Sequence, residues 1–120
     1  QGRTTIIGEL VDFDLNKISP DVIAQAASQG DKVAQTIIKD AGFYIGVAAA
    51  NVCVCVGPRK IVIAGGVSHI GDPILEAIRA TMRERVTIMP VEQVAVVQAT
   101  LGDNAGVIGV ALWAADHFNN

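Results

Sequence analysis

The spacing of apolar residues predicts two short helices in the first part of the chain. Residues 4–12 place their apolar side chains on one helical face, although the β-branched residues at the start are equally compatible with a strand. After a polar connector, Ser19 and Pro20 form a clear helix start, with Ser19 as the N-cap and Pro20 in the first helical position. Apolar residues at helical spacing continue this second helix as far as Gln29-Gly30.

A long helix is predicted from Asp31, which can cap it, to about Val56, where Gly57-Pro58 ends it. Residues 41–58 carry no charge over 18 positions, which is near the lower limit for a membrane-spanning helix. The stretch contains glycines and an asparagine, and the helical pattern extends into charged neighbours. We therefore expect a helix buried on most sides within a globular domain rather than a membrane span.

Two strands separated by a helix are predicted in the second half of the chain. Residues 60–64 form a continuous β-branched, apolar run, which is typical of a parallel strand buried on both faces, and residues 93–100 repeat this character. Between them, a helix opens at Asp72-Pro73 with apolar residues on one side and arginines on the other. The strands should therefore be parallel, with helices covering the sheet. Because two strands make a poor sheet, the chain is expected to be part of a larger α/β domain or to complete its sheet with a partner.

A last helix is predicted after a sharp turn at residues 101–103 and should run to about Phe118, with Asp103 able to cap it. Its pattern includes Gly106 and Gly109. Glycine is unfavourable inside a helix, so these two positions are expected to permit close approach by another backbone or a ligand.

Composition limits the function classes. The hydrophobic share is 51% and the charged share 18%, so the 120 residues are not disordered and allow one domain, or part of one. Nine basic against twelve acidic residues give a net charge of -3 without a basic cluster, which argues against contacts with nucleic acid or an anionic membrane surface. Cys53 and Cys55 are expected to be buried free thiols, which fits a reducing, cytoplasmic compartment.

Glycine turns follow both predicted strands. Gly65-Gly66 comes directly after the first strand, and residues 102–106 follow the second. If the strands are parallel, both turns lie at the carboxyl edge of the sheet, where α/β proteins bind ligands. Glycine backbone there could lie against a flat ring or a phosphate; a simple tight turn is the alternative. The sequence around Gly65 matches neither a dinucleotide-binding fingerprint nor a P-loop.

Other polar residues give no pattern that indicates chemistry. His69 is expected to be an exposed loop residue and His117 a surface residue, and no cysteine or carboxylate lies at metal-ligand spacing from either. The acidic residues between 9 and 14 are expected to be a solvated connector. No Ser/His/Asp or Cys/His triad can be assembled from the sequence.

Taken together, these blocks resemble the C-terminal part of the ROK family of repressors and sugar kinases, which includes glucokinases. The resemblance covers about residues 19–116, and its order and spacing of motifs are specific to the family rather than to a subfamily. The matching blocks are Gly30-Asp31, Gly42, Tyr44-Ile45-Gly46-Val47, Asn51, Gly57-Pro58, Ile61-Val62-Ile63-Ala64-Gly65-Gly66-Val67, Gly71-Asp72-Pro73-Ile74-Leu75, Ile78-Arg79 and Leu101-Gly102-Asp103-Asn104-Ala105-Gly106-Val107-Ile108-Gly109.

The resemblance implies an α/β fold, namely the C-terminal part of an actin-like ATPase (ribonuclease H-like) lobe. It also implies that Gly65, Gly66 and Val67 face the adenosine of ATP, and that Asp103 and Asn104 line the far rim of the same site. Family members usually carry three glycines after this strand, and Ala64 replaces the first of them here. The added methyl group would either narrow the pocket or pack beneath it.

The family's phosphate loops, catalytic aspartate, sugar-binding residues and cysteine-rich zinc loop all precede the matching region. Residues 1–120 are therefore expected to be one C-terminal fragment without an internal boundary, belonging to a cytoplasmic, homo-oligomeric sugar kinase that uses ATP with Mg²⁺ and a hexose. Alone, the chain lacks the catalytic residues that phosphoryl transfer needs. Two alternatives remain open: the sugar-sensing lobe of a ROK transcriptional repressor, and a non-enzymatic dimerisation domain.

Overall fold

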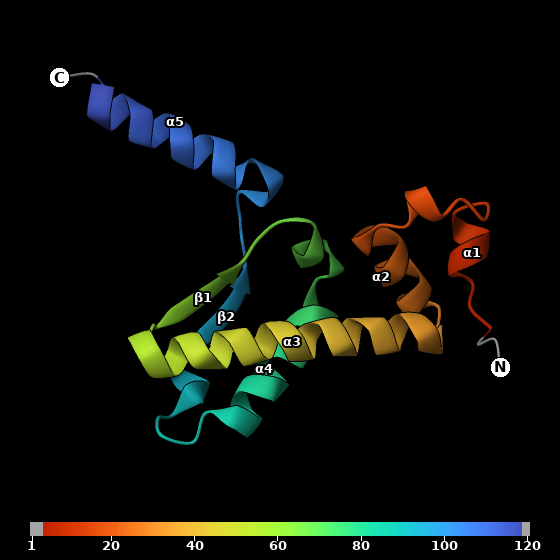
Figure 1. Ribbon diagram of the computed structural model, residues 1–120, viewed down its shortest axis with the longest axis horizontal. Coiled ribbons are helices and arrows are strands. Elements are labelled where there is room, and N and C mark those ends of the chain that lie inside the picture. Colours follow the sequence, from red (N-terminus) through yellow and green to blue (C-terminus); the bar gives the residue numbers. More distant parts are fainter. Residues whose placement is uncertain (1–3, 119–120) are drawn as a thin grey trace.

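Helices make up most of the fold, together with one small two-stranded sheet. The computed structural model describes residues 4–118 (Figure 1). In chain order the elements are α1 (Ile7–Leu10), α2 (Pro20–Ser28), α3 (Lys32–Val56), β1 (Lys60–Ile63), α4 (Asp72–Arg85), β2 (Ala95–Gln98) and α5 (Ala105–Phe118). Short 3₁₀ turns occupy Leu15–Lys17, Gly66–Ile70, Val91–Gln93 and Gly102–Asn104.

Asp31 joins the first segment of the chain to the start of α3. Its Oδ1 accepts the backbone N–H groups of Val33 and Ala34 at 2.8 and 2.9 Å, which is the expected N-cap geometry. Its Oδ2 accepts the Thr5 hydroxyl and the Ile6 N–H, both at 2.7 Å. These donors hold the pKa of the Asp31 carboxyl below its ordinary value, with the Ala34 N–H as the largest cause. The ambiguous residues 4–12 thus form an anchored segment whose regular part is the helix α1.

Helices α3 and α4 pack closely because two glycines lie at their crossing. A Cβ built at Gly42 would lie 2.3 Å from the Cβ of Ala77, and one at Gly46 would lie 2.6 Å from the Cβ of Thr81. Both distances are shorter than any real contact, so only glycine permits this approach. The α4 face turned inward carries Ile74 and Ile78, each 0% exposed, at the centre of the core.

β1 and β2 form a parallel sheet, as the sequence predicted, and Ile61 pairs with Val96. Each strand is shorter than predicted. Helix α4 connects the two strands and also packs against β2. The predicted helix ends are confirmed as well: Ser19 caps α2, and Gly57 ends α3 in the left-handed conformation with φ 64°. The parallel strand-helix-strand unit is therefore confirmed, whereas the expected cover by helices is incomplete: α4 packs against β2, but Val62 in β1 is 55% exposed and α5 has no buried residue.

Three expectations about burial were wrong. β1 is not buried on both faces, because no residue of this strand is buried and Val62 is 55% exposed. The long helix α3 is buried along one face only: 33% of its most apolar 18-residue window is buried, and side chains such as Tyr44 and Val56 are exposed. By length and composition alone α3 could cross a membrane; its packing against α2 and α4 favours a structural role within the fold. Cys53 is buried as expected, and burial raises the pKa of its thiol, but Cys55 is exposed because it lies on the open side of α3.

Helix α5 extends away from the remaining elements (Figure 1) and has no buried residue. Val107, Leu112 and Trp113 are all more than half exposed. No heavy atom lies within 4 Å of the Cβ positions built at Gly106 and Gly109, so the close approach expected there is not made within the described residues and stays a prediction.

Candidate functional site

The first glycine turn, residues 65–70, begins where β1 ends. Gly65 has φ 79° and ψ -176°, a backbone region that side chains rarely tolerate, and the space beside its Cβ position is open to 4 Å. The backbone N–H and the hydroxyl of Ser68 both donate to the Gly65 carbonyl, at 2.9 and 2.7 Å. Because Ser68 is 1% exposed, this pair of hydrogen bonds holds the turn from inside the fold. The outer side of the turn, including Val67, is exposed.

Helix α2 supports this turn from one side. A Cβ built at Gly66 would lie 3.6 Å from Cγ of Pro20, which is an ordinary van der Waals distance. The Ser19 cap and Pro20 thus place the first turn of α2 beside the turn that follows β1. Gly66 itself does not have a positive φ, so its lack of a side chain leaves room beside the backbone without being required by the backbone conformation.

The second glycine turn, residues 102–106, begins soon after β2 and includes the start of α5. Gly102 adopts φ 53°, and Asp103 and Asn104 follow within a 3₁₀ turn. The two glycine turns meet: Nε2 of His69 lies 3.2 Å from Oδ1 of Asp103. The prediction that both turns lie at one edge of the sheet is therefore confirmed.

His69 is an exposed loop residue, as predicted, but its ring makes two contacts that the sequence did not indicate. Its side chain is 31% exposed, and its Nδ1 lies 3.5 Å from Oδ1 of Asp21 in the first turn of α2. Asp103 differs from prediction, because its side chain contacts His69 rather than capping the backbone of α5. Sequence reasoning missed this arrangement, since the three residues lie in three separate segments and no local motif links them.

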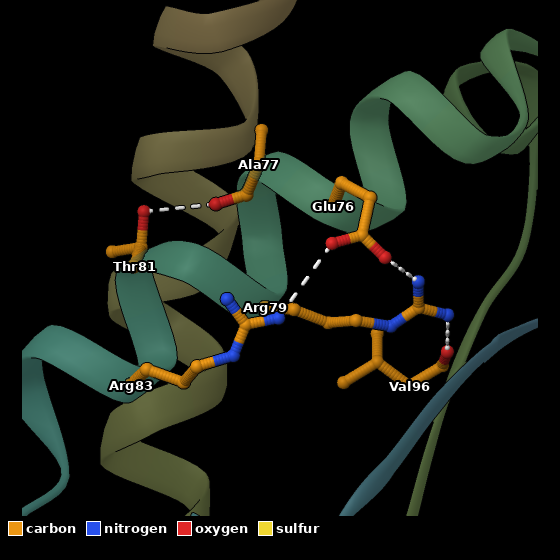
Figure 2. Close-up of polar contacts among 6 residues, drawn as sticks. All are labelled: Glu76, Ala77, Arg79, Thr81, Arg83 and Val96. Carbon is orange, nitrogen blue, oxygen red and sulfur yellow. Dashed lines mark hydrogen bonds and ion pairs between the residues drawn. The ribbon is translucent and has the colours of Figure 1, made fainter. Parts of the chain in front are cut away.

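A separate cavity of about 410 Å³ lies beside the start of β2, lined by α4 and by residues 91–97. Figure 2 shows how its arginines are engaged: Arg79 donates to Glu76 and, at 2.6 Å, to the outward-facing carbonyl of Val96, while Arg83 lies 3.6 Å from Glu76. The Arg79 hydrogen bond is the main cause that lowers the pKa of Glu76. Because both guanidinium groups are already paired, we interpret this cluster as a cover for the sheet edge rather than as the ligand site.

Among residues 4–118, no group of three or more His, Cys, Asp or Glu side chains is placed to hold a metal ion. His117 is exposed and stacks on Trp113 in α5, with ring centroids 4.2 Å apart. The pair of glycine turns is therefore the candidate binding site of the described chain. Its backbone is exposed, and the side chains of Asp21, His69 and Asp103 lie beside it.

Comparisons with known proteins agree on one family. A family model described as "ROK family" matches residues 4–117. A glucokinase from Halalkalibacterium halodurans is 35% identical over 82% of this chain and 30% of its own length. A xylose repressor from Caldicellulosiruptor bescii is 27% identical over 80% of this chain and 24% of its own length.

A solved structure of a ROK family glucokinase from Streptomyces griseus, in complex with glucose and AMPPNP, aligns with a TM-score of 0.79 at 30% identity. The alignment covers 92% of this chain and 36% of that one. The chain thus spans about a third or less of the length of the relatives that it matches.

Proposed function

The chain belongs to the ROK family, and from this premise we propose that it forms the nucleotide-side C-terminal part of an ATP-dependent sugar kinase. The observation that carries the proposal is the meeting of two glycine turns at the carboxyl edge of parallel strands, through His69 and Asp103. The likeness to a glucokinase solved with glucose and AMPPNP supports the same reading. Residues 1–120 would form one unit of an actin-like ATPase lobe, with the rest of that lobe contributed by the larger protein.

In this proposal Gly65, Gly66 and Val67 lie against the adenosine, and Asp103 and Asn104 form the opposite rim. The geometry fits such a ligand, because the backbone at Gly65 is open to 4 Å and a flat purine ring needs a surface without side chains. Ala64 lies before this surface, at the end of β1.

The chain's own contribution to catalysis would be binding and orientation. When bound, ATP supplies the phosphoryl group and Mg²⁺ neutralises its charge. The glycine turns would hold the purine so that the triphosphate points away from the sheet edge toward the hexose. Ligands for Mg²⁺ and the base that accepts the hexose hydroxyl proton would come from the larger protein, because residues 4–118 offer no grouped ligands.

A second function is favoured by the match to a xylose repressor, in which this part would belong to a sugar-sensing lobe. The two functions differ in what they require of the glycine turns. A kinase needs them to bind ATP, whereas a repressor needs only a sugar and DNA. Cytoplasmic localisation and a homo-oligomeric state are further parts of our proposal, and sedimentation of the intact protein tests the second.

Nucleotide titration of the intact protein tests the proposal. Gly66→Val adds bulk to the turn proposed to hold the purine, at a position whose φ does not require glycine, so ATP binding should weaken strongly while hexose binding persists. Gly66→Ala should give a smaller loss. ATP affinity that is unchanged in both variants would remove the site assignment, and a protein that binds a hexose but no ATP would favour the repressor.

A further inference from the structure

One imidazole contacts carboxylates from two other segments of the chain. His69 belongs to the first glycine turn, Asp21 to the first turn of α2, and Asp103 to the second glycine turn. The ring nitrogens lie 3.5 Å from the Asp21 carboxylate and 3.2 Å from the Asp103 carboxylate. The histidine thus links the two turns that would form the nucleotide rim, and it also links them to α2.

Little else in the described chain holds the second glycine turn in place. No heavy atom lies within 4 Å of the Cβ position built at Gly102, and α5, which follows, has no buried residue. The side chains of Asp21 and Asp103 are 69% and 66% exposed, so each contact stabilises the fold only slightly. We therefore expect the two His69 contacts to affect where the second glycine turn lies more than they affect the stability of the domain.

The chemistry of the three groups makes the ring necessary for this position. A neutral imidazole donates from one nitrogen and an imidazolium from both, so the ring can satisfy one or both carboxylates. Without the ring, no group would join the two carboxylates, and their mutual repulsion, although screened by water, would favour a wider separation. Loss of His69 should therefore move Asp103 and Asn104 away from the first turn.

We propose that His69 is a positioning residue, which fixes the separation between the first glycine turn and the Asp103–Asn104 rim so that both turns contact the same nucleotide. This inference rests on the proposed function, because it takes the nucleotide site as given. It predicts that His69 contributes to nucleotide affinity without contacting the hexose.

The test is calorimetric titration of the intact protein with a non-hydrolysable ATP analogue and, separately, with glucose. His69→Ala should weaken analogue binding about three- to ten-fold, because the second glycine turn loses the contact that holds it beside the first. Glucose affinity and melting temperature should not change. His69→Gln, whose amide can still donate to Asp103, should recover part of the affinity. The other histidine provides the matched control: His117→Ala should bind the analogue as the unsubstituted protein does.

A double-variant cycle shows whether the histidine acts through Asp103. Asp103→Asn combined with His69→Ala should weaken binding less than the sum of the two single effects. Unchanged analogue affinity in His69→Ala, while Gly66→Val abolishes binding, would overturn the positioning role and leave the site assignment intact. The positioning role would also be overturned if both His69 variants lost analogue affinity and glucose affinity to the same extent and melted at a lower temperature. That result would indicate a residue that supports the fold as a whole. Failure of Gly66→Val to weaken binding would overturn the proposed function itself.

Discussion

The Ser68 hydroxyl donates to the Gly65 carbonyl at 2.7 Å, and the Ser68 side chain is buried beneath the turn that it closes. The Ser68 N–H donates to the same oxygen at 2.9 Å. Because Gly65 has a backbone conformation that few residues adopt, these two bonds keep the open face of the turn in one arrangement. A buried serine side chain thus holds a turn whose glycines are exposed.

Ser68→Ala should therefore destabilise the chain by about 0.5 to 1.5 kcal/mol, the usual net value of one hydrogen bond. Ser28 provides a matched control, because its hydroxyl also donates to a backbone carbonyl at 2.7 Å but is exposed. Urea denaturation of both variants checks the difference. Equal losses for Ser68→Ala and Ser28→Ala would mean that burial of the Ser68 bond does not matter.

Alanine at Gly42 or Gly46 should force α3 and α4 apart and cost about 1 to 3 kcal/mol through overpacking. Gly109→Ala is the control, since Gly109 is also helical but has no neighbour within 4 Å of its Cβ position. In the 120-residue chain that substitution should be neutral or slightly stabilising, because alanine favours the helix. A stable Gly42→Ala variant with native circular dichroism would contradict the observed crossing.

Asp31 should make the fold sensitive to acid. Its folded pKa is lowered from the ordinary 3.8, so its stabilising contribution is fully present above that value and is lost as the pH falls through the lower folded pKa. The stability advantage of the unsubstituted protein over Asp31→Asn should therefore shrink as the pH is lowered through this range. Thr5→Val removes one donor to the carboxylate and should reduce the same advantage in part. Thermal melting at a series of acidic pH values measures this, and an advantage that stays constant would contradict the assignment.

Local signals in the sequence predicted much of this fold. The caps at Ser19 and Asp31, the helix end at Gly57 and the parallel direction of both strands follow from short-range chemistry, and all four are confirmed. The two glycine turns were predicted to be neighbours because parallel strands end at the same sheet edge, and the contact of His69 with Asp103 bears this out.

Contacts between distant segments could not be predicted. His69 has no partner in its own segment, and nothing local to it indicates two carboxylates. The burial of Cys53 but not Cys55 depends on which face of α3 meets α4, which an almost uniformly apolar sequence does not indicate. Helix α5 is exposed because no described element covers it, and its own pattern, which is apolar all round, does not indicate this.

Whether the glycine turn after β1 binds the purine of ATP is tested most directly by nucleotide affinity in Gly65→Val. Gly71→Val is the matched control, because Gly71 also combines a positive φ of 75° with an extended ψ and has open space at its Cβ position. Calorimetric titration of the intact protein with an ATP analogue should show a large loss of affinity for Gly65→Val alone, with glucose affinity retained. Equal analogue affinity in the Gly65 variant, the Gly71 variant and the unsubstituted protein would contradict the account.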